Sequence, residues 1–426
     1  MAIAQVTSLS TLTGGAAVIT NYSRELRRKA VLRDIYTNLR APEVIYEGQR
    51  MAIPNGIYGT ISPKDASGAN SIRVTLKLPI NANILRGSTV ALNTEVAPIL
   101  RTGSLYRNNY RFVVQDEPGY GIDKLDAEPY RLYQTHVDDL SPHAQAEEGL
   151  EVRMALVETY GWNLMAGATA NLCPAQWNRN VFVAGRTVAQ QPAFHPTWAT
   201  YTNRIVSAMD QASGGNGQFA QTAAQMLSGL VMDQLAIYGL RRRMMPLSIN
   251  GRSAFVLTIS DVQAARFSNP NFTDTLGNRW INAAGLSEKE QNWYGILGVW
   301  RSAVGVDIYV VHDERLPTLL PTGSAEPFGL GAYYVWPTDN DDRQLDNELI
   351  RDASILHGRG AVCNFEPEKM HYIKDDYDYD IRNGYGYAGV RGIQQLQFDT
   401  TPQDATGVAR EYYGSALVIL GRYDGY

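Results

Sequence analysis

The stretch from residue 141 to residue 165 (SPHAQAEEGLEVRMALVETYGWNLM) constrains the fold most strongly, because it has the pattern of one long helix. Ser141 is a good N-cap and Pro142 suits the first helical position. Apolar or small residues then recur at steps of four, three, four and three, which places them on one stripe: Leu150, Met154, Val157, Gly161 and Leu164. Acidic residues mark the polar side: Glu147, Glu148, Glu151 and Glu158. At 1.5 Å per residue the helix would be roughly 37 Å long, a spine on which sheets could pack.

Composition and charge limit the class of protein. The chain has 426 residues, 44% of them hydrophobic and 19% charged, so it can bury a large core in two or three domains. The net charge of −5 argues against a wholly basic nucleic-acid binder, so any nucleic-acid contact would be local. Cys173 and Cys363 fit neither a disulfide framework nor a zinc site, which predicts a reducing compartment. We expect no signal peptide and no membrane span, because no apolar run is long enough.

Residues 24–40 (RELRRKAVLRDIYTNLR) form a basic amphipathic pattern after an N-terminal stretch of small and polar residues. Leu26, Ala30, Ile35 and Leu39 make up its apolar side. The basic side chains are candidate interaction residues for phosphates or for an acidic neighbouring subunit: Arg24, Arg27, Arg28, Lys29, Arg33 and Arg40. The solvated face of an ordinary helix explains the same pattern without a partner, so both interpretations stay open.

The segment 56–80 is extended in pattern. In SIRVTLKLPI the apolar residues Ile72, Val74 and Leu76 alternate with polar ones, which predicts a strand with two different faces. A polar turn precedes this strand, so we expect a long hairpin over 56–80. An isolated two-stranded hairpin is marginally stable, so its apolar face, Ile72, Val74 and Leu76, is a candidate interaction surface.

The second half alternates helices and strands. The patterns predict a helix over 219–243, a strand over 254–260, a short helix over 261–267, a loop over 269–280 and a half-buried strand around Val306, Ile308 and Val310. The segment 219–336 therefore indicates a compact α/β or α+β module, and from about residue 350 the pattern is β again.

No motif for catalysis, a cofactor or a metal stands out. The loop 214–220 has GxGxxA spacing but no strand before it, as a dinucleotide site requires. The acidic run 375–380 lacks the glycine and glutamate of a calcium loop. The six histidines never have metal-ligand spacing, and His312 and Asp313, as strand neighbours, would point to opposite faces. We therefore assign no catalytic, cofactor-binding or metal residue.

Three segments carry a resemblance to a known family: AFVLTISDVQAARFSNPNF, GILGVWRSAVGVDIYVVHDERLP and GYGYAGVRGIQQLQF. Together with the order of basic helix, hairpin, spine helix, α/β module and returning β segment, they resemble the major capsid proteins of tailed bacteriophages. That family has the HK-type capsid fold, which it shares with herpesviruses. The resemblance covers most of the chain and rests on patterns of turns and strands.

The resemblance implies an α+β fold of the HK-type phage major capsid class, with an N-arm, an extended hairpin loop, a spine-helix peripheral domain and an α/β axial domain. The implied parts are an N-terminal arm (1–50), the extended loop hairpin with flanking strands (51–100), a peripheral domain containing the spine helix (101–215), an axial domain (216–345) and a β-rich segment returning to the peripheral domain (346–426). No scaffold-like coiled coil opens the chain, so a scaffolding protein would be separate.

The implied function is a structural one without catalysis. The same chain would form hexamers and pentamers that close into an icosahedral head around the phage genome, after assembly in the host cytoplasm. Implied partners are separate scaffolding, portal and decoration proteins, and packaged DNA held by weak contacts of the inner surface. Two alternatives stay open: a tail or decoration protein of the virion, and a carbohydrate-active hydrolase with an acid pair, which the 25 tyrosines and seven tryptophans suggest.

Overall fold

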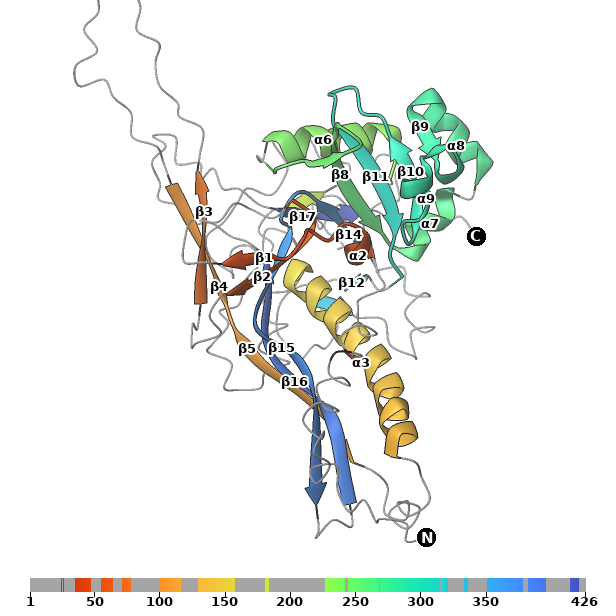
Figure 1. Ribbon diagram of the computed structural model, residues 1–426. Helices are drawn as coiled ribbons and strands as arrows, with labels where there is room; N and C mark the ends of the chain where they lie inside the picture. The colour runs from red at the N-terminus through yellow and green to blue at the C-terminus, as the bar shows by residue number, and fades with distance from the viewer. Residues whose placement is uncertain are drawn as a thin grey trace, which may run out of the picture.

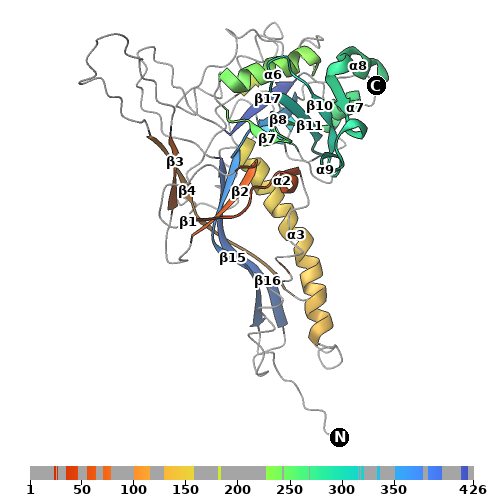
Figure 2. The same cartoon turned by 45° about the horizontal axis from the view of Figure 1, so that its top comes forward.

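The computed structural model shows two large sheets and one long helix (Figure 1). It describes residues 24, 26, 35–46, 55–63, 71–77, 100–115, 129–157, 181–183, 227–241, 244–267, 269–314, 316, 318–320, 333–335, 351–377, 382–395 and 414–420. An α/β part with the helix α6 forms one end of the molecule, and a long strand pair beside the helix α3 forms the other (Figures 1 and 2). The mixed α+β class expected from the sequence is confirmed.

A ten-stranded mixed sheet forms the α/β part, with β8 and β11 at its centre. These two strands are parallel, while β14 pairs antiparallel with β8 and β10 pairs antiparallel with β11. The strands of this sheet are β6 (Val181–Val183), β7 (Leu247–Ile249), β8 (Arg252–Ile259), β9 (Trp280–Asn282), β10 (Ile296–Trp300), β11 (Asp307–His312), β12 (Thr318–Leu320), β13 (Tyr333–Val335), β14 (Arg351–His357) and β17 (Ser415–Leu420).

The central strand β11 is buried on both faces, so the prediction of a half-buried strand is wrong. Ile308 and Val310 pack with Phe255 against α6, while Tyr309 packs on the opposite face in a cluster that includes Val152 of α3. A parallel pair at the centre of a sheet with both faces covered is buried throughout, whatever its local alternation.

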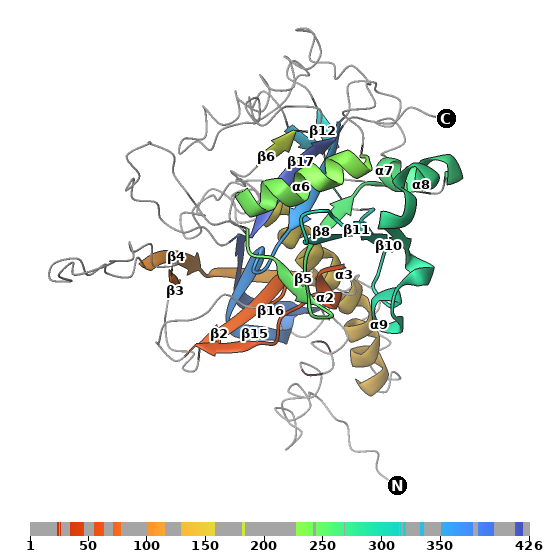
Figure 3. The ribbon, with the colours of Figure 1, turned by 90° about the horizontal axis from the view of Figure 1, so that it is seen from above.

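Helix α6 (Gly229–Arg241) covers one face of this sheet (Figure 3). It begins later than the predicted residue 219, since Leu227 and Ser228 precede it without being helical. Ser228 Oγ accepts a hydrogen bond from the Val231 N–H at 3.4 Å, as an N-cap does. Leu230 is 68% exposed, whereas Val231, Leu235 and Tyr238 face the sheet and are buried. Residues 219–226 lie outside the described residues.

The loop predicted over 269–280 is mostly helical. Helix α8 (Pro270–Leu276) follows α7 (Asp261–Phe267), and a short 3₁₀ turn, η4 (Gly277–Arg279), leads into β9. Asn269 followed by Pro270 is a helix-start signal that the loop prediction overlooked, and the Asn269 carbonyl accepts hydrogen bonds from the N–H groups of Phe272 and Thr273. The turn η5 (Ala283–Gly285) and helix α9 (Glu288–Gln291), with a capping box between Ser287 and Glu290, complete this region.

The spine helix exists but begins earlier than predicted. Helix α3 runs over Pro129–Val157, so Ser141 is not its N-cap and Pro142 lies inside it. Pro142 is exposed, so its ring lies on the solvent side, and Leu140 and Ala144 on either side of it are packed in a core cluster. Packing on both sides of the proline holds the helix together despite one missing backbone hydrogen bond. The predicted continuation over 158–165, with Gly161 and Leu164, lies outside the described residues.

The second sheet has five strands and carries α3 along its side (Figure 2). Its order is β1 (Val44–Tyr46), β2 (Tyr58–Pro63), β15 (Val362–Tyr377), β16 (Arg382–Gln395) and β5 (Asn108–Gln115). The antiparallel pair β15–β16 is the long ribbon of Figure 1. At the N-terminal side, Leu26 and Ile35 are buried, as the amphipathic pattern predicted, and helix α2 spans Ile35–Asn38.

The predicted hairpin over 56–80 is wrong, because β2 and the strand β3 (Ser71–Lys77) do not pair with each other. β2 lies between β1 and β15, parallel to both, and β3 pairs antiparallel with β4 (Leu100–Tyr106). Tyr58–Ile61 are buried, which suits an interior strand. Alternation predicts a strand but does not identify its partner. β4 continues into β5, so the β3–β4 ribbon extends from the edge strand of the five-stranded sheet (Figure 3).

Sheet membership does not follow the boundary expected between residues 345 and 346. β14 and β17 come from the returning segment, yet both belong to the ten-stranded sheet, where β14 pairs with β8. β15 and β16, by contrast, belong to the five-stranded sheet. The division of the chain into domains stays a prediction.

Candidate functional site

The predicted basic surface is described at two of its six positions. Arg24 is exposed. Arg40 is exposed too, but its Nη2 donates to Thr60 Oγ1 at 2.8 Å and its guanidinium lies 5.2 Å from the centroid of the Tyr58 ring. Arg40 therefore has partners within its own chain. The other predicted positions lie outside the described residues: Arg27, Arg28, Lys29 and Arg33.

The predicted apolar surface of β3 is covered within the single chain. Ile72 and Val74 are 2% and 0% exposed, and Ile72 lies opposite the buried Leu105 of β4. The side chain of Leu76 lies outside the described part of the chain. The role of these residues in association stays a prediction.

A buried ion pair joins the spine helix to the ten-stranded sheet. Arg153 of α3 donates from Nε and Nη2 to the two carboxylate oxygens of Asp313 at 2.9 and 2.7 Å, just after β11. Arg153 Nη1 donates to the Gly149 carbonyl, and the guanidinium lies 5.5 Å from the ring centroid of Tyr36 in α2. Three separate parts of the chain therefore meet at one guanidinium.

A second buried arginine joins α3 to the five-stranded sheet. Arg391 of β16 donates from Nε to Glu151 Oε2 at 2.8 Å and has Glu148 Oε2 at 3.9 Å. Glu148 also accepts a hydrogen bond from the Tyr58 hydroxyl at 2.7 Å. Burial raises the pKa of Glu151, and the charge of Arg391 opposes that shift. The prediction that Glu151 lies on the polar, outer side of the spine is therefore wrong, because its charge is balanced inside.

A histidine occupies the inner end of β14. The His357 Nε2 lies 3.2 Å from Thr258 Oγ1 of β8, and the His357 ring meets the Tyr36 ring edge to face at 5.6 Å. Burial lowers the pKa of His357 to about 3, so this imidazole is neutral at physiological pH. It links the ten-stranded sheet to α2 without adding a buried charge.

Glycines make the connection between the two sheets close-packed. Gly360 has φ +67°, and its N–H donates to the Gly56 carbonyl at 2.6 Å. A Cβ on Gly414 would lie 2.4 Å from the Cα of Ala361, where no side chain fits. We infer that this junction, with its two buried arginines, fixes the two sheets and α3 relative to one another.

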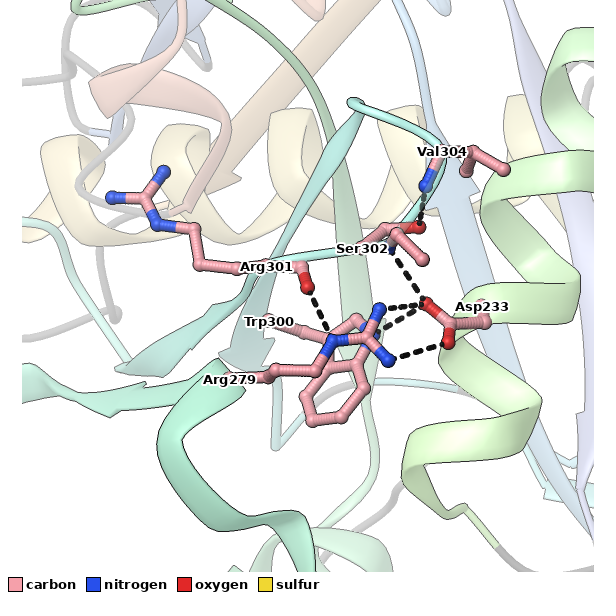
Figure 4. Close-up of polar contacts among 7 residues, drawn as sticks. Asp233, Arg279, Trp300, Arg301, Ser302 and Val304 are labelled. Carbon is pink, nitrogen blue, oxygen red and sulfur yellow. Dashed lines mark hydrogen bonds and ion pairs between the residues drawn. The ribbon is translucent and has the colours of Figure 1, made fainter.

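A polar cluster on Asp233 holds the exposed turn between β10 and β11 (Figure 4). Asp233 of α6 accepts hydrogen bonds from Arg279 Nη1 and Nη2 at 3.0 and 2.9 Å, and from Trp300 Nε1 at 2.9 Å. Burial raises the pKa of Asp233, but hydrogen bonds from Trp300, Arg279 and Ser302 outweigh it and keep the pKa below its ordinary value. The turn is therefore fixed to α6 by a charged anchor.

These charged residues were missed by sequence reasoning. Arg153 and Asp313 lie far apart in the chain, and so do Arg391 and Glu151, so no local spacing connects them. The one available signal in the sequence is Asp313, a charged residue directly after an apolar strand.

Within the described residues, no group of three or more His, Cys, Asp or Glu side chains could hold a metal ion. Cys363 is buried, and burial raises the pKa of its thiol. Among the described helices, none is long and apolar enough to cross a membrane. The loop 214–220 and Cys173 lie outside the described residues, and so do residues 378–380 of the acidic run.

Comparison with solved structures identifies the fold. The capsid of Ralstonia phage GP4 aligns over 93% of both chains with a TM-score of 0.57 and 13% sequence identity. The acid-stable capsid of Helicobacter pylori bacteriophage KHP30 aligns over 88% of this chain and 93% of the other, with a TM-score of 0.52 and 10% identity. The capsid of cyanophage Pam1 aligns over 91% and 93%, with a TM-score of 0.50 and 10% identity. No protein-family model and no curated protein matches the chain.

The chain therefore has the fold of phage capsid proteins, as the resemblance implied. The likeness extends over nearly the whole length of both chains rather than over one module.

Proposed function

We propose that this protein is the major capsid protein of a bacteriophage and that copies of it assemble into the icosahedral head enclosing the genome. The observation that carries the proposal is the alignment with the GP4 capsid over 93% of each chain. A match to a single shared module would leave other roles open, whereas here the alignment spans nearly the whole of both chains. The role is structural rather than catalytic.

In this proposal, hexamers and pentamers of the one chain form the shell. Residues 1–23 of the N-terminal arm (1–50) and the part of the extended loop (51–100) that follows β2 reach neighbouring subunits, while α2, β1 and β2 pack within their own subunit. Residues 101–215 and 346–426 make the peripheral domain and residues 216–345 make the axial domain, with β6, β14 and β17 adding strands to the sheet of the axial domain. Affinity accumulates over many weak contacts, because each bound subunit raises the effective concentration of the next contact.

The buried junction supports this division of labour. Arg153, Arg391 and the close-packed glycines fix the two sheets and α3, so that the body of the subunit can keep its shape while exchanged segments make the contacts. Separate scaffolding, portal and decoration proteins, and weak inner contacts with packaged DNA, complete the proposed set of partners. Assembly takes place in the host cytoplasm, and the final location is the virion.

The test is the association state of the full-length protein. We expect negative-stain electron microscopy and light scattering to show rings, tubes or shells built from the 47.2 kDa chain. A monomer at every protein and salt concentration, also after co-expression with the neighbouring genes of its phage, would contradict the proposal.

A further inference from the structure

Two arginines share one buried carboxylate at one end of the ten-stranded sheet. Asp307 opens β11 and lies beside Ala254 of the parallel strand β8, and it is 4% exposed. Arg252, the first residue of β8, donates from Nη1 to Asp307 Oδ2 at 3.3 Å. Arg301, which follows β10, donates from Nη1 to the same oxygen. One anion therefore faces two cations.

The positive charge that remains is open to solvent. The side chains of Arg252 and Arg301 are 60% and 31% exposed. Each guanidinium has five N–H donors, and Asp307 takes one from each. Within the part of the chain that the structure describes, neither arginine has a second carboxylate within 4.0 Å. Glu290, which feels the charge of Arg301, gives its oxygens to Ser287 and Tyr309 instead.

Both arginines are held in place by their backbones. Arg252 follows the two-residue turn between β7 and β8, in which Asn250 and Gly251 have φ of 50° and 76°, as a tight type I′ hairpin requires. The Arg301 N–H donates to the Arg279 carbonyl at 2.8 Å, and Arg279 Nε donates to the Arg301 carbonyl at 2.9 Å. Figure 4 shows the Arg301 side chain directed away from the Asp233 cluster. Fixed backbones, together with the hydrogen bond from each guanidinium to Asp307, lower the entropy lost when a ligand binds.

We propose that Arg252 and Arg301 form a docking site for a carboxylate side chain of a second copy of this chain. A guanidinium binds a carboxylate through paired hydrogen bonds, so the exposed donors match that group in geometry as well as in charge. A second copy of the chain fits as the partner, because the chain carries 43 acidic and 38 basic residues. Its acidic residues therefore outnumber the basic residues that could pair with them. The inference rests on the proposed self-assembly.

The experiment compares Arg252→Gln and Arg252→Glu with Arg241→Gln, which removes the same charge from an exposed position at the end of α6. The readout is the subunit concentration at half-maximal assembly, followed by light scattering at low salt. We expect Arg252→Gln to raise this concentration about two- to fivefold, as for the loss of an exposed ion pair, and Arg252→Glu to raise it further. Arg241→Gln should assemble like the wild type, and thermal unfolding of the separated subunits should be the same for the wild type, Arg252→Gln and Arg241→Gln, because Arg301 still balances Asp307 in each of them.

Assembly of Arg252→Glu at the wild-type concentration would overturn the docking site while leaving the proposed function intact. Binding of a short DNA duplex, measured in parallel, tests whether the two arginines bind a phosphate instead of a carboxylate. If Arg252→Gln loses affinity for DNA and assembles normally, the pair is a phosphate site and the docking proposal is wrong. If the wild type itself never associates, the proposed function fails, and the docking site fails with it.

Discussion

Arg153 and Asp313 form an ion pair with two hydrogen bonds, and their side chains are 1% and 2% exposed. The pair connects the spine helix α3 to the end of β11, the central strand of the ten-stranded sheet. Two charges so completely removed from water are tolerated only together, since either one alone would be buried without a counter-charge. The contribution of this pair to stability therefore depends on α3 keeping its position against the ten-stranded sheet.

Breaking this pair from one side should be costly. We expect Asp313→Asn to lower the free energy of unfolding by about 3–5 kcal/mol, because Arg153 then stays buried with its charge unbalanced. Urea denaturation of the separated subunit measures the change. The double variant Arg153→Met/Asp313→Leu serves as the control and should lose less than Asp313→Asn. Equal losses would show that the packing, and not the charge, is what matters at this position.

The buried histidine predicts how stability depends on pH. In the folded chain burial lowers the pKa of His357 to about 3, whereas in the unfolded chain it titrates near its ordinary value of 6.5. Between these values only the unfolded state takes up the proton, so stability is lost as the pH falls from about 6.5 toward 3. The slope from this residue is at most about 1.4 kcal/mol per pH unit.

The variant His357→Gln isolates that contribution, because the amide can still hydrogen-bond to Thr258 without titrating. We expect its unfolding free energy to change less between pH 7 and 4 than that of the wild type, as measured by urea denaturation at each pH. Parallel curves for the two proteins would mean that His357 is not responsible for the acid sensitivity.

The close-packed junction predicts a strong effect of a single methyl group. Gly414→Ala would place its Cβ against the backbone of Gly360 and Ala361, so the backbone at residue 414 or at residues 360–361 must move. We expect the free energy of unfolding to fall by about 1–3 kcal/mol. Gly305→Ala is the control. The φ of +81° at Gly305 is strained for alanine, but no atom lies within 4 Å of the Cβ that the substitution adds. A loss at Gly414 no greater than at Gly305 would contradict the close approach.

The N-terminal arm can be tested without damaging the core. Leu26 and Tyr36 are fully buried, so a deletion through residue 40 would remove core residues together with the arm. Deleting residues 1–23 spares both. We expect soluble subunits with wild-type thermal stability that fail to close into shells when viewed by electron microscopy. Normal shells from this shortened chain would show that residues 1–23 are not needed for closure.

Local patterns predicted the elements better than their partners. The strand β8 and the helix α7 followed from short contiguous signals, and both were confirmed. The partner of β2 could not be found, because Val362 and its neighbours in β15 lie far along the chain and no local rule selects them. Ser141 followed by Pro142 is a typical helix start, yet α3 continues past both residues because Leu140 and Ala144 pack in a core cluster.

The candidate functional residues were harder to predict for a related reason. A buried charge such as Glu151 is indistinguishable from a surface charge in the sequence, since only its partner, Arg391 on β16, makes burial possible. The burial of the Asp307 carboxylate could not be predicted either, because the pattern around Ile308 and Val310 predicted a strand with one solvent-exposed face. The fold class could be inferred from the order of elements, and the charged connections required coordinates.

Cryo-electron microscopy of particles formed by the full-length protein tests the central claim most directly. We expect closed shells in which rings of five and six subunits are built from this chain alone, with the Arg153–Asp313 pair intact in every subunit. Particles without such rings, or a subunit that stays monomeric under every condition tried, would contradict the assignment as a shell-forming capsid protein.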